Sequence, residues 1–140
     1  CGSGLFSLPL VRRGASVTAV EENRTAIDDL GTNVRLNRLD ANRVRAIAGR
    51  VEDVIDRVAG TRWDAVLLDP PREGCAPGVL DAVFGRLAPP TAVYVSCDPD
   101  VLARDLGAIR AMGYRVDRVQ AVDMFPHTDH IETVVVLTRA

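Results

Sequence analysis

The sequence predicts an α/β fold with a mostly parallel sheet, and three observations carry that prediction. Short apolar runs alternate along the chain with segments whose apolar residues recur at helical spacing. Glycine or proline separates most of these segments, as in repeated strand–helix units. The last two apolar runs are joined by about eight residues, too few for a parallel crossover, so this pair is expected to be antiparallel.

Each element follows from its own pattern. The predicted strands are apolar runs that end at a turn or a polar residue: 16–20, 44–48, 63–68, 92–95, 114–122 and 131–137. The predicted helices have apolar residues three or four positions apart: 4–13, 22–39, 51–58, 79–87 and the segment that starts at Pro99. Asp98 is a suitable N-cap for that last helix, and Gly113 is expected to end it.

Length and composition place narrow bounds on the protein. With 140 residues, 47% hydrophobic and 26% charged, residues 1–140 are expected to form one globular domain. No apolar run reaches membrane length, and three scattered cysteines suit neither a disulfide framework nor a zinc cluster. A cytoplasmic location, no membrane association, no metal site and no obligate protein partner are therefore expected.

The net charge and the first residues of the chain each lead to a further expectation. The net charge of −2 gives no overall basic field for nucleic acid, although all 17 basic residues are arginine, which suits phosphate contacts. The chain opens on a glycine turn of the kind that follows a strand, yet no strand precedes Cys1. We therefore expect a fragment whose sheet lacks its first strand.

Candidate site residues follow the predicted strands, where ligands of open α/β sheets bind. Gly2 and Gly4 allow a tight turn and a close backbone approach, and Glu21 could bind ribose hydroxyls at the end of the next strand. Ser7 replaces the third glycine of a dinucleotide fingerprint. These residues indicate a nucleoside cofactor without separating NAD from S-adenosylmethionine.

Two further strand ends carry reactive groups. Asp69 precedes Pro70 and Pro71, which stiffen the loop; Arg72 after them suits RNA phosphate and a bracing contact equally. Cys97 lies where a strand gives way to a helix, and the positive helix end would favour its thiolate. A free cysteine is more often a small buried hydrophobe, so Cys97 alone decides nothing.

The polar loop before the last strand is the remaining candidate. His127 and His130 are spaced like weak metal ligands, but no acidic or cysteine pattern accompanies them, so a structural role is favoured. Glu132 enters the last strand; if it faces the site, partial desolvation would raise its pKa and suit it to proton transfer.

Four motifs together resemble the bacterial RNA 5-methyluridine methyltransferases. In chain order they are Cys1-Gly2-Ser3-Gly4, Asp69-Pro70-Pro71-Arg72, Ser96-Cys97-Asp98-Pro99, and Asp123-Met124-Phe125-Pro126-His127-Thr128 with His130-Ile131-Glu132. The resemblance runs through nearly all of the chain and implies a Rossmann-like class I methyltransferase sheet, mostly parallel with an antiparallel last strand. It also implies S-adenosyl-L-methionine as cofactor and rRNA or tRNA as substrate.

The resemblance implies a role for each matching residue. Cys97 matches the nucleophile that adds to uracil C6, and Glu132 matches the base that removes the C5 proton. Glu21 matches the acid on the cofactor ribose, Asp69 matches a cofactor-site acid near the reacting methyl, and Gly2 with Gly4 matches the turn under the methionine part. Arg50 and Leu5 depart from the family pattern, since relatives often have Asp or Asn at the first position and some have Asn at the second.

Three alternatives remain beside this interpretation. A cytosine-C5 RNA methyltransferase usually carries its nucleophile in a different loop. A dinucleotide-dependent oxidoreductase is disfavoured by Ser7 and by Cys97. The third alternative is an inactive fragment of the catalytic domain.

Overall fold

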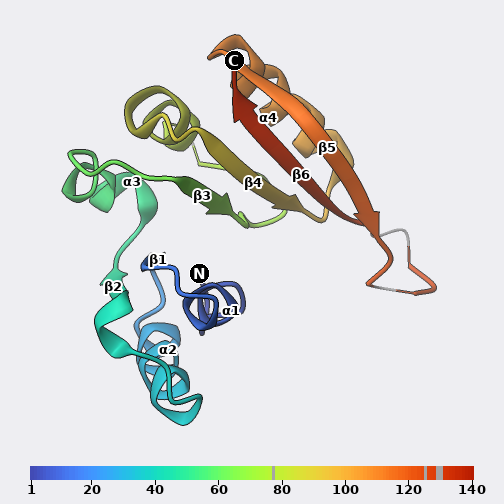
Figure 1. The fold of residues 1–140 in the computed structure, drawn as a ribbon. Coiled ribbons are helices and arrows are strands. Elements are labelled where there is room, and N and C mark those ends of the chain that lie inside the picture. Colours follow the sequence, from blue (N-terminus) through green and yellow to red (C-terminus); the bar gives the residue numbers. More distant parts are fainter. Residues whose placement is uncertain (77, 125, 129–130) are drawn as a thin grey trace. The chain divides into compact units, whose positions relative to one another are not determined.

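The computed structural model describes residues 1–76, 78–124, 126–128 and 131–140. The chain divides into two compact units, Cys1–Val54 and Ile55–Ala140. Each unit has its own sheet, of two strands in the first and four in the second (Figure 1). None of the helices in the described ranges is long and apolar enough to cross a bilayer.

The first unit pairs a small parallel sheet with helices. Its elements are α1 (Ser7–Arg12), β1 (Val17–Glu21), α2 (Arg24–Leu36), the 3-10 turn η1 (Ala41–Arg43), β2 (Val44–Ala48) and α3 (Val51–Val54). β1 and β2 run parallel, with Val17 opposite Val44 and Glu21 opposite Ala48. Both strands lie within one residue of the predicted bounds.

A compact apolar cluster holds the first unit together. Leu30 and Val34, one helical turn apart on α2, pack on Ala19 of β1 and are at most 3% exposed. The Asn23 side chain accepts hydrogen bonds from the backbone N–H groups of Thr25 and Ala26. This cap explains why α2 begins two residues later than the apolar pattern predicts.

The second unit is built on a mixed four-stranded sheet. Its elements are the 3-10 turn η2 (Ile55–Arg57), β3 (Ala65–Leu68), the π-helical segment η3 (Asp81–Leu87), β4 (Thr91–Ser96), α4 (Pro99–Ala111), β5 (Tyr114–Val122) and β6 (Glu132–Arg139). The strand order is β3-β4-β6-β5, and Figure 1 shows α4 along one face of this sheet. β3 and β4 are parallel, whereas β6 is antiparallel to β4 and to β5.

The predicted antiparallel pairing of the last two strands is confirmed. The structure adds that β6 lies between β4 and β5, so it is a central strand rather than an edge. Val135 and Leu137 of β6 are fully buried, which fixes the face that this strand turns to the core.

The predicted helix over 79–87 is present, but most of it has the wider turn of a π-helix rather than that of an α-helix. Its last seven residues are π-helical, and the N–H of Ala88, in a left-handed conformation, donates to the carbonyl of Val83. Phe84 of this segment meets Tyr114 edge-on, with ring centroids 4.9 Å apart, and the Tyr114 hydroxyl donates to the Pro89 carbonyl at 2.7 Å. These contacts tie η3 to the start of β5.

The apolar cluster of the first unit generates a stability prediction. Leu30→Ala leaves a cavity at a fully buried position, so the free energy of unfolding should fall by about 2–5 kcal/mol. The same substitution at Leu36, on the same helix but 74% exposed, is the matched control and should change stability little. Native-state hydrogen exchange of the α2 and β1 amides measures both; equal losses for the two variants would contradict the assignment of this core.

Candidate functional site

The glycine turn of the first unit is held from two sides. Gly4 has φ +106°, and a Cβ there would lie 2.6 Å from the Leu30 side chain, so only glycine lets the turn rest on α2. The Asn33 side chain, also on α2, donates to the Ser3 carbonyl at 3.1 Å. Gly2 has φ +55° and open space where a Cβ would stand, which leaves its backbone accessible to a ligand.

Glu21 at the end of β1 is bonded into the same turn. One carboxylate oxygen, Oε2, accepts from the Gly2 N–H at 2.9 Å and from the Cys1 amino group at 3.1 Å. The other, Oε1, accepts from the Asn23 N–H at 3.0 Å. Because a carboxylate oxygen accepts two hydrogen bonds, Oε1 retains capacity for a hydroxyl donor.

The proton affinity of Glu21 reflects these contacts. Partial burial alone would raise its pKa, but the hydrogen bonds from Asn23 and Gly2 and the nearby amino group outweigh burial and lower the pKa to about 2. The side chain is therefore ionised at neutral pH and acts only as an acceptor. Such a group suits a ligand that offers hydroxyl donors.

In the second unit, Asp69 follows β3 and begins the segment that we name the Asp69 loop, residues 69–75. Asp69 is partly open to solvent, and the burial of its carboxylate raises its pKa. Three residues along, Arg72 Nε lies 3.7 Å from the carboxylate of Asp98. This ion pair favours the bracing role of Arg72 over the phosphate role, between which the sequence did not choose.

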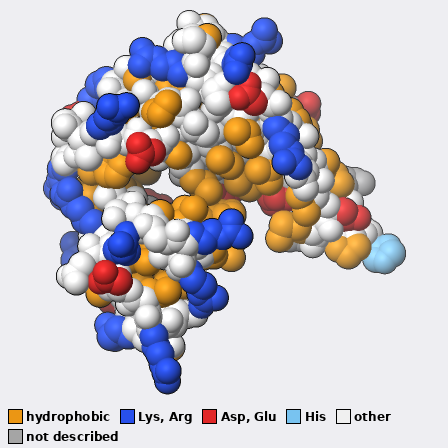
Figure 2. All heavy atoms as spheres, viewed as in Figure 1, with side chains coloured by type: hydrophobic (Ala, Val, Ile, Leu, Met, Phe, Trp, Pro, Cys, Tyr) orange, Lys and Arg blue, Asp and Glu red, His pale blue; other side chains and the backbone are white. Residues whose placement is uncertain are grey.

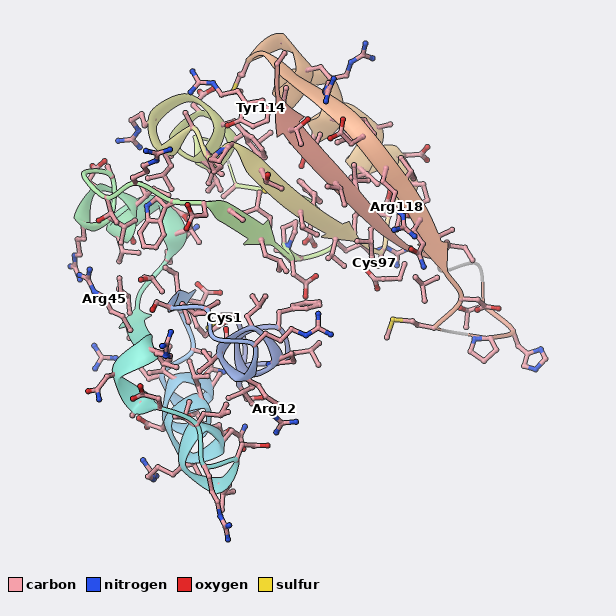
Figure 3. All side chains as sticks on the ribbon, in the orientation of Figure 1. Cys1, Arg12, Arg45, Cys97, Tyr114 and Arg118 are labelled. Carbon is pink, nitrogen blue, oxygen red and sulfur yellow. The ribbon has the colours of Figure 1, made fainter. Side chains whose placement is uncertain are left out.

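Cys97 directly follows β4, at the predicted transition from strand to helix (Figure 3). Its free thiol is half-buried. The buried Ser96 hydroxyl donates to the Asp98 carbonyl at 3.0 Å and accepts from the Asp98 N–H at 3.2 Å, so it closes the turn around Cys97. The Asp98 side chain caps α4 and Pro99 occupies the first turn, as predicted.

The pairing of β4 with β6 relates Cys97 to Glu132. Ser96 is the last residue of β4 in the ladder, and it lies opposite Thr133. Cys97 and Glu132 each stand one position further along these antiparallel strands, at the same edge of the sheet. The register therefore places Cys97 and Glu132 next to the same end of the β4–β6 ladder.

Glu132 is surrounded by features that disfavour its charge. It is half-buried at the start of β6, opposite Val122 of β5. Burial raises its pKa, and the negative charge of Asp69 raises it further. Asp69 and Glu132 are therefore close enough to interact, which is the electrostatic condition expected of a general base.

The predicted site residues thus fall into two sets. Gly2, Gly4 and Glu21 form one turn in the first unit, and Asp69, Cys97 and Glu132 lie at strand ends of the second. His130 of the predicted histidine pair lies outside the described residues. The structure adds two residues that sequence reasoning did not single out, namely Asn33, which donates to the Ser3 carbonyl, and the buried Asp105 of α4.

One of these residues had a visible signal in the sequence. Asp105 stands three positions after Leu102 and four before Ile109, so it lies on the apolar face of α4 rather than on its polar face. A carboxylate in an apolar helical stripe predicts a buried, bonded acid. Asn33 carried no comparable signal, because a polar residue at that position also fits an exposed site.

The fold described above is that of a class I methyltransferase. Residues 1–140 match the family described as tRNA (Uracil-5-)-methyltransferase, and the chain belongs to that family. The chain is 44% identical over 136 residues to the 23S rRNA (uracil(1939)-C(5))-methyltransferase of Enterobacter sp. (strain 638). It is 42% identical over 140 residues to an uncharacterized RNA methyltransferase of Clostridium tetani.

A solved structure is also similar. The tRNA (uracil-54, C5)-methyltransferase of Pyrococcus abyssi, in complex with S-adenosyl-L-homocysteine, matches 98% of this chain with a TM-score of 0.82 and 35% identity. The Enterobacter relative matches 96% of this chain and the Clostridium relative 99%. The chain in turn spans only 32% of the P. abyssi structure, 31% of the Enterobacter relative and 30% of the Clostridium relative. The predicted family and fold class are confirmed.

The hydrogen bonds of Glu21 generate a pH prediction. Because its folded pKa of about 2 lies below the ordinary 4.5, Glu21 stabilises the fold above pH 4.5, and this contribution is lost as pH falls toward 2. Glu21→Gln should therefore flatten the pH dependence of the unfolding free energy across that interval. Circular dichroism during denaturant unfolding measures it, with Glu22→Gln, the exposed neighbour, as control; equal flattening in both variants would contradict the assignment.

Proposed function

We propose that the protein transfers a methyl group from S-adenosyl-L-methionine to C5 of a uridine in RNA, through a covalent bond between Cys97 and C6 of the base. The observation that carries this proposal is the β4–β6 register, which brings a thiol and a carboxylate of raised pKa to one sheet edge. Family membership supports the same reaction class.

Cys97 would act as the nucleophile. Uracil C5 is a weak nucleophile, and addition of the thiolate to C6 moves the C5–C6 π electrons toward C5 and the C4 carbonyl. The activated C5 then attacks the methyl carbon of the sulfonium, whose C–S bond breaks. The turn closed by Ser96 would keep Cys97 at one orientation during this addition.

Glu132 would act as the base in the final step. After methyl transfer, C5 carries both the new methyl group and its original hydrogen. Glu132 would remove that proton, the electrons would re-form the C5–C6 double bond, and the Cys97 thiolate would leave. A carboxylate whose proton affinity is raised by burial and by Asp69 is better matched to this step than an ordinary surface glutamate.

The first unit offers groups that fit the nucleoside part of S-adenosyl-L-methionine. Glu21 is an ionised acceptor with capacity left on Oε1, as ribose hydroxyls require, and the backbone at Gly2 is open to approach. Gly4 would support this turn, and Asp69 would lie near the methyl group. When bound, the cofactor supplies an electrophilic methyl group; the P. abyssi relative was solved with its demethylated product form.

RNA would be the partner of this chain, as the names of its relatives indicate. One is named for 23S rRNA and another for tRNA, so either RNA is a candidate substrate. A base inside a helix would not expose C6 to a thiol, so the target uridine is expected to be unstacked from a loop or bulge. Figure 2 shows arginine side chains dispersed over the visible face of each unit, with acidic side chains among them.

The nucleophile assignment predicts a trapped adduct. RNA containing 5-fluorouridine should stay attached to the wild-type protein when S-adenosyl-L-methionine is present, because fluorine at C5 does not leave as a proton. Cys97→Ala should give no adduct, whereas Cys75→Ala, the other thiol of the second unit, should still give one. Mass spectrometry of the intact complex measures the bond; normal turnover by Cys97→Ala would refute the mechanism.

The base assignment predicts a different defect. Glu132→Gln should methylate ordinary uridine RNA but stay attached to it, since the C5 proton is not removed. The control is Asp81→Asn, which removes an exposed carboxylate of the second unit and should release its product normally. Denaturing gels separate free RNA from RNA that is attached to the protein. An adduct that forms with 5-fluorocytidine RNA but not with 5-fluorouridine RNA would instead favour the cytosine-C5 alternative.

A further inference from the structure

A buried charge on α4 takes no part in the reaction proposed above. Asp105 is 3% exposed, and no other charged residue in the described ranges is buried. Burying a carboxylate costs free energy unless hydrogen bonds and a counter-charge compensate it. Its partners therefore indicate what the residue holds in place.

Three different elements donate hydrogen bonds to Asp105. The Tyr94 hydroxyl, on β4, donates to Oδ2 at 2.6 Å. The backbone N–H of Cys75, at the end of the Asp69 loop, donates to the same oxygen at 3.3 Å. The guanidinium of Arg104 donates to Oδ1 through Nε at 2.9 Å and Nη2 at 2.8 Å. One carboxylate thus joins β4, α4 and the Asp69 loop.

The Asp69 loop also lies directly against the helix. Gly74 has φ +87°, and a Cβ there would lie between 2.6 and 2.8 Å from atoms of Arg104, Val101 and Asp105. Arg104 Nη2 donates to the carbonyl of Glu73 at 3.1 Å as well. With this positive φ and these side chains where a Cβ would stand, the close approach of the loop to α4 favours glycine at this position.

The same helix contacts the loop at a second point and carries the Cys97 turn at its start. Arg72 of the loop pairs with Asp98, which caps α4 and directly follows Cys97. Tyr94 stands three residues before Cys97 on β4 and is fully buried. The contacts of Asp105 and the Arg72–Asp98 ion pair together connect the Asp69 loop to the residues on both sides of Cys97.

We infer that Asp105 is a positioning residue, which holds the Asp69 loop in register with the strand ends that carry Cys97 and Glu132. This inference rests on the proposed function. β3 fixes the loop where it begins at Asp69, and Asp105 with Arg104 fixes it where it ends at Cys75. Because a displacement of about 1 Å in a reacting group can slow a reaction roughly 100-fold, the anchor affects rate through Asp69 and Cys97 without touching substrate.

Asp105→Asn in the intact protein tests the inference. Asparagine keeps the shape but loses the charge and one acceptor oxygen. We expect kcat for 5-methyluridine formation to fall roughly 10- to 100-fold, while KM for RNA changes less than about threefold. Hydrogen exchange should accelerate at the amides of residues 72–76, with those of β4 and β6 as protected as in the wild type.

Two further variants keep the test decisive if Asp105→Asn fails to fold. Tyr94→Phe removes one donor from the carboxylate, and Gly74→Ala displaces the loop from its contact with α4. Both should give the same lowered kcat and the same loosened loop. Combining Gly74→Ala with Asp105→Asn should be no slower than the slower single variant, because both act on one contact. Asp81→Asn, with the same charge change at an exposed position, is the control.

The outcomes separate this inference from the proposed function. A loosened loop with wild-type kcat, or a lowered kcat with an unchanged loop, overturns the positioning role. A wild-type protein that methylates neither rRNA nor tRNA overturns the proposed function instead. Measuring the hydrogen exchange of residues 72–76 requires no activity, so unchanged exchange in all three variants would still overturn the role assigned to Asp105.

Discussion

The ladder between β4 and β6 is the constraint on which the candidate reaction centre depends. It runs from Thr91 opposite Thr138 to Ser96 opposite Thr133, and the core fixes its register through the buried Val135 and Leu137. A slip of one residue would turn every side chain of β6 to the other face and carry Glu132 away from Cys97. The burial that stabilises the second unit therefore also sets which residues of β4 and β6 end at this edge of the sheet.

The acids at these strand ends differ in proton affinity because their surroundings differ. Glu132 is half-buried near another carboxylate, and both burial and the charge of Asp69 raise its pKa. Asp98 shares the same sheet edge, but the N–H groups of Val101 and Asp100 and the Arg72 guanidinium lower its pKa. The opposite pKa shifts of these two carboxylates thus come from their neighbours.

Local sequence patterns predicted many of the helices and strands, whereas features that depend on contacts between distant segments were not predicted. The bounds of β2 and β5 agree with the prediction, and the chain passes from strand to helix at Cys97–Asp98–Pro99 as expected. Both were predictable because caps and turn residues act over a few positions. The insertion of β6 between β4 and β5 depends on contacts far apart in sequence, which periodicity does not encode. Likewise, proximity of Asp69 to Glu132 required a strand order that no single motif contains.

The Asp105 cluster shows why a charge is retained where an apolar group would pack. A leucine at this position could fill the space, and replacing buried charges by apolar residues is often neutral or stabilising. An apolar contact, however, has no direction, whereas the carboxylate accepts from Tyr94, Cys75 and Arg104 along fixed lines. Only the second arrangement fixes the Asp69 loop against sliding along α4, so the buried charge is better explained by geometry at the strand ends than by stability.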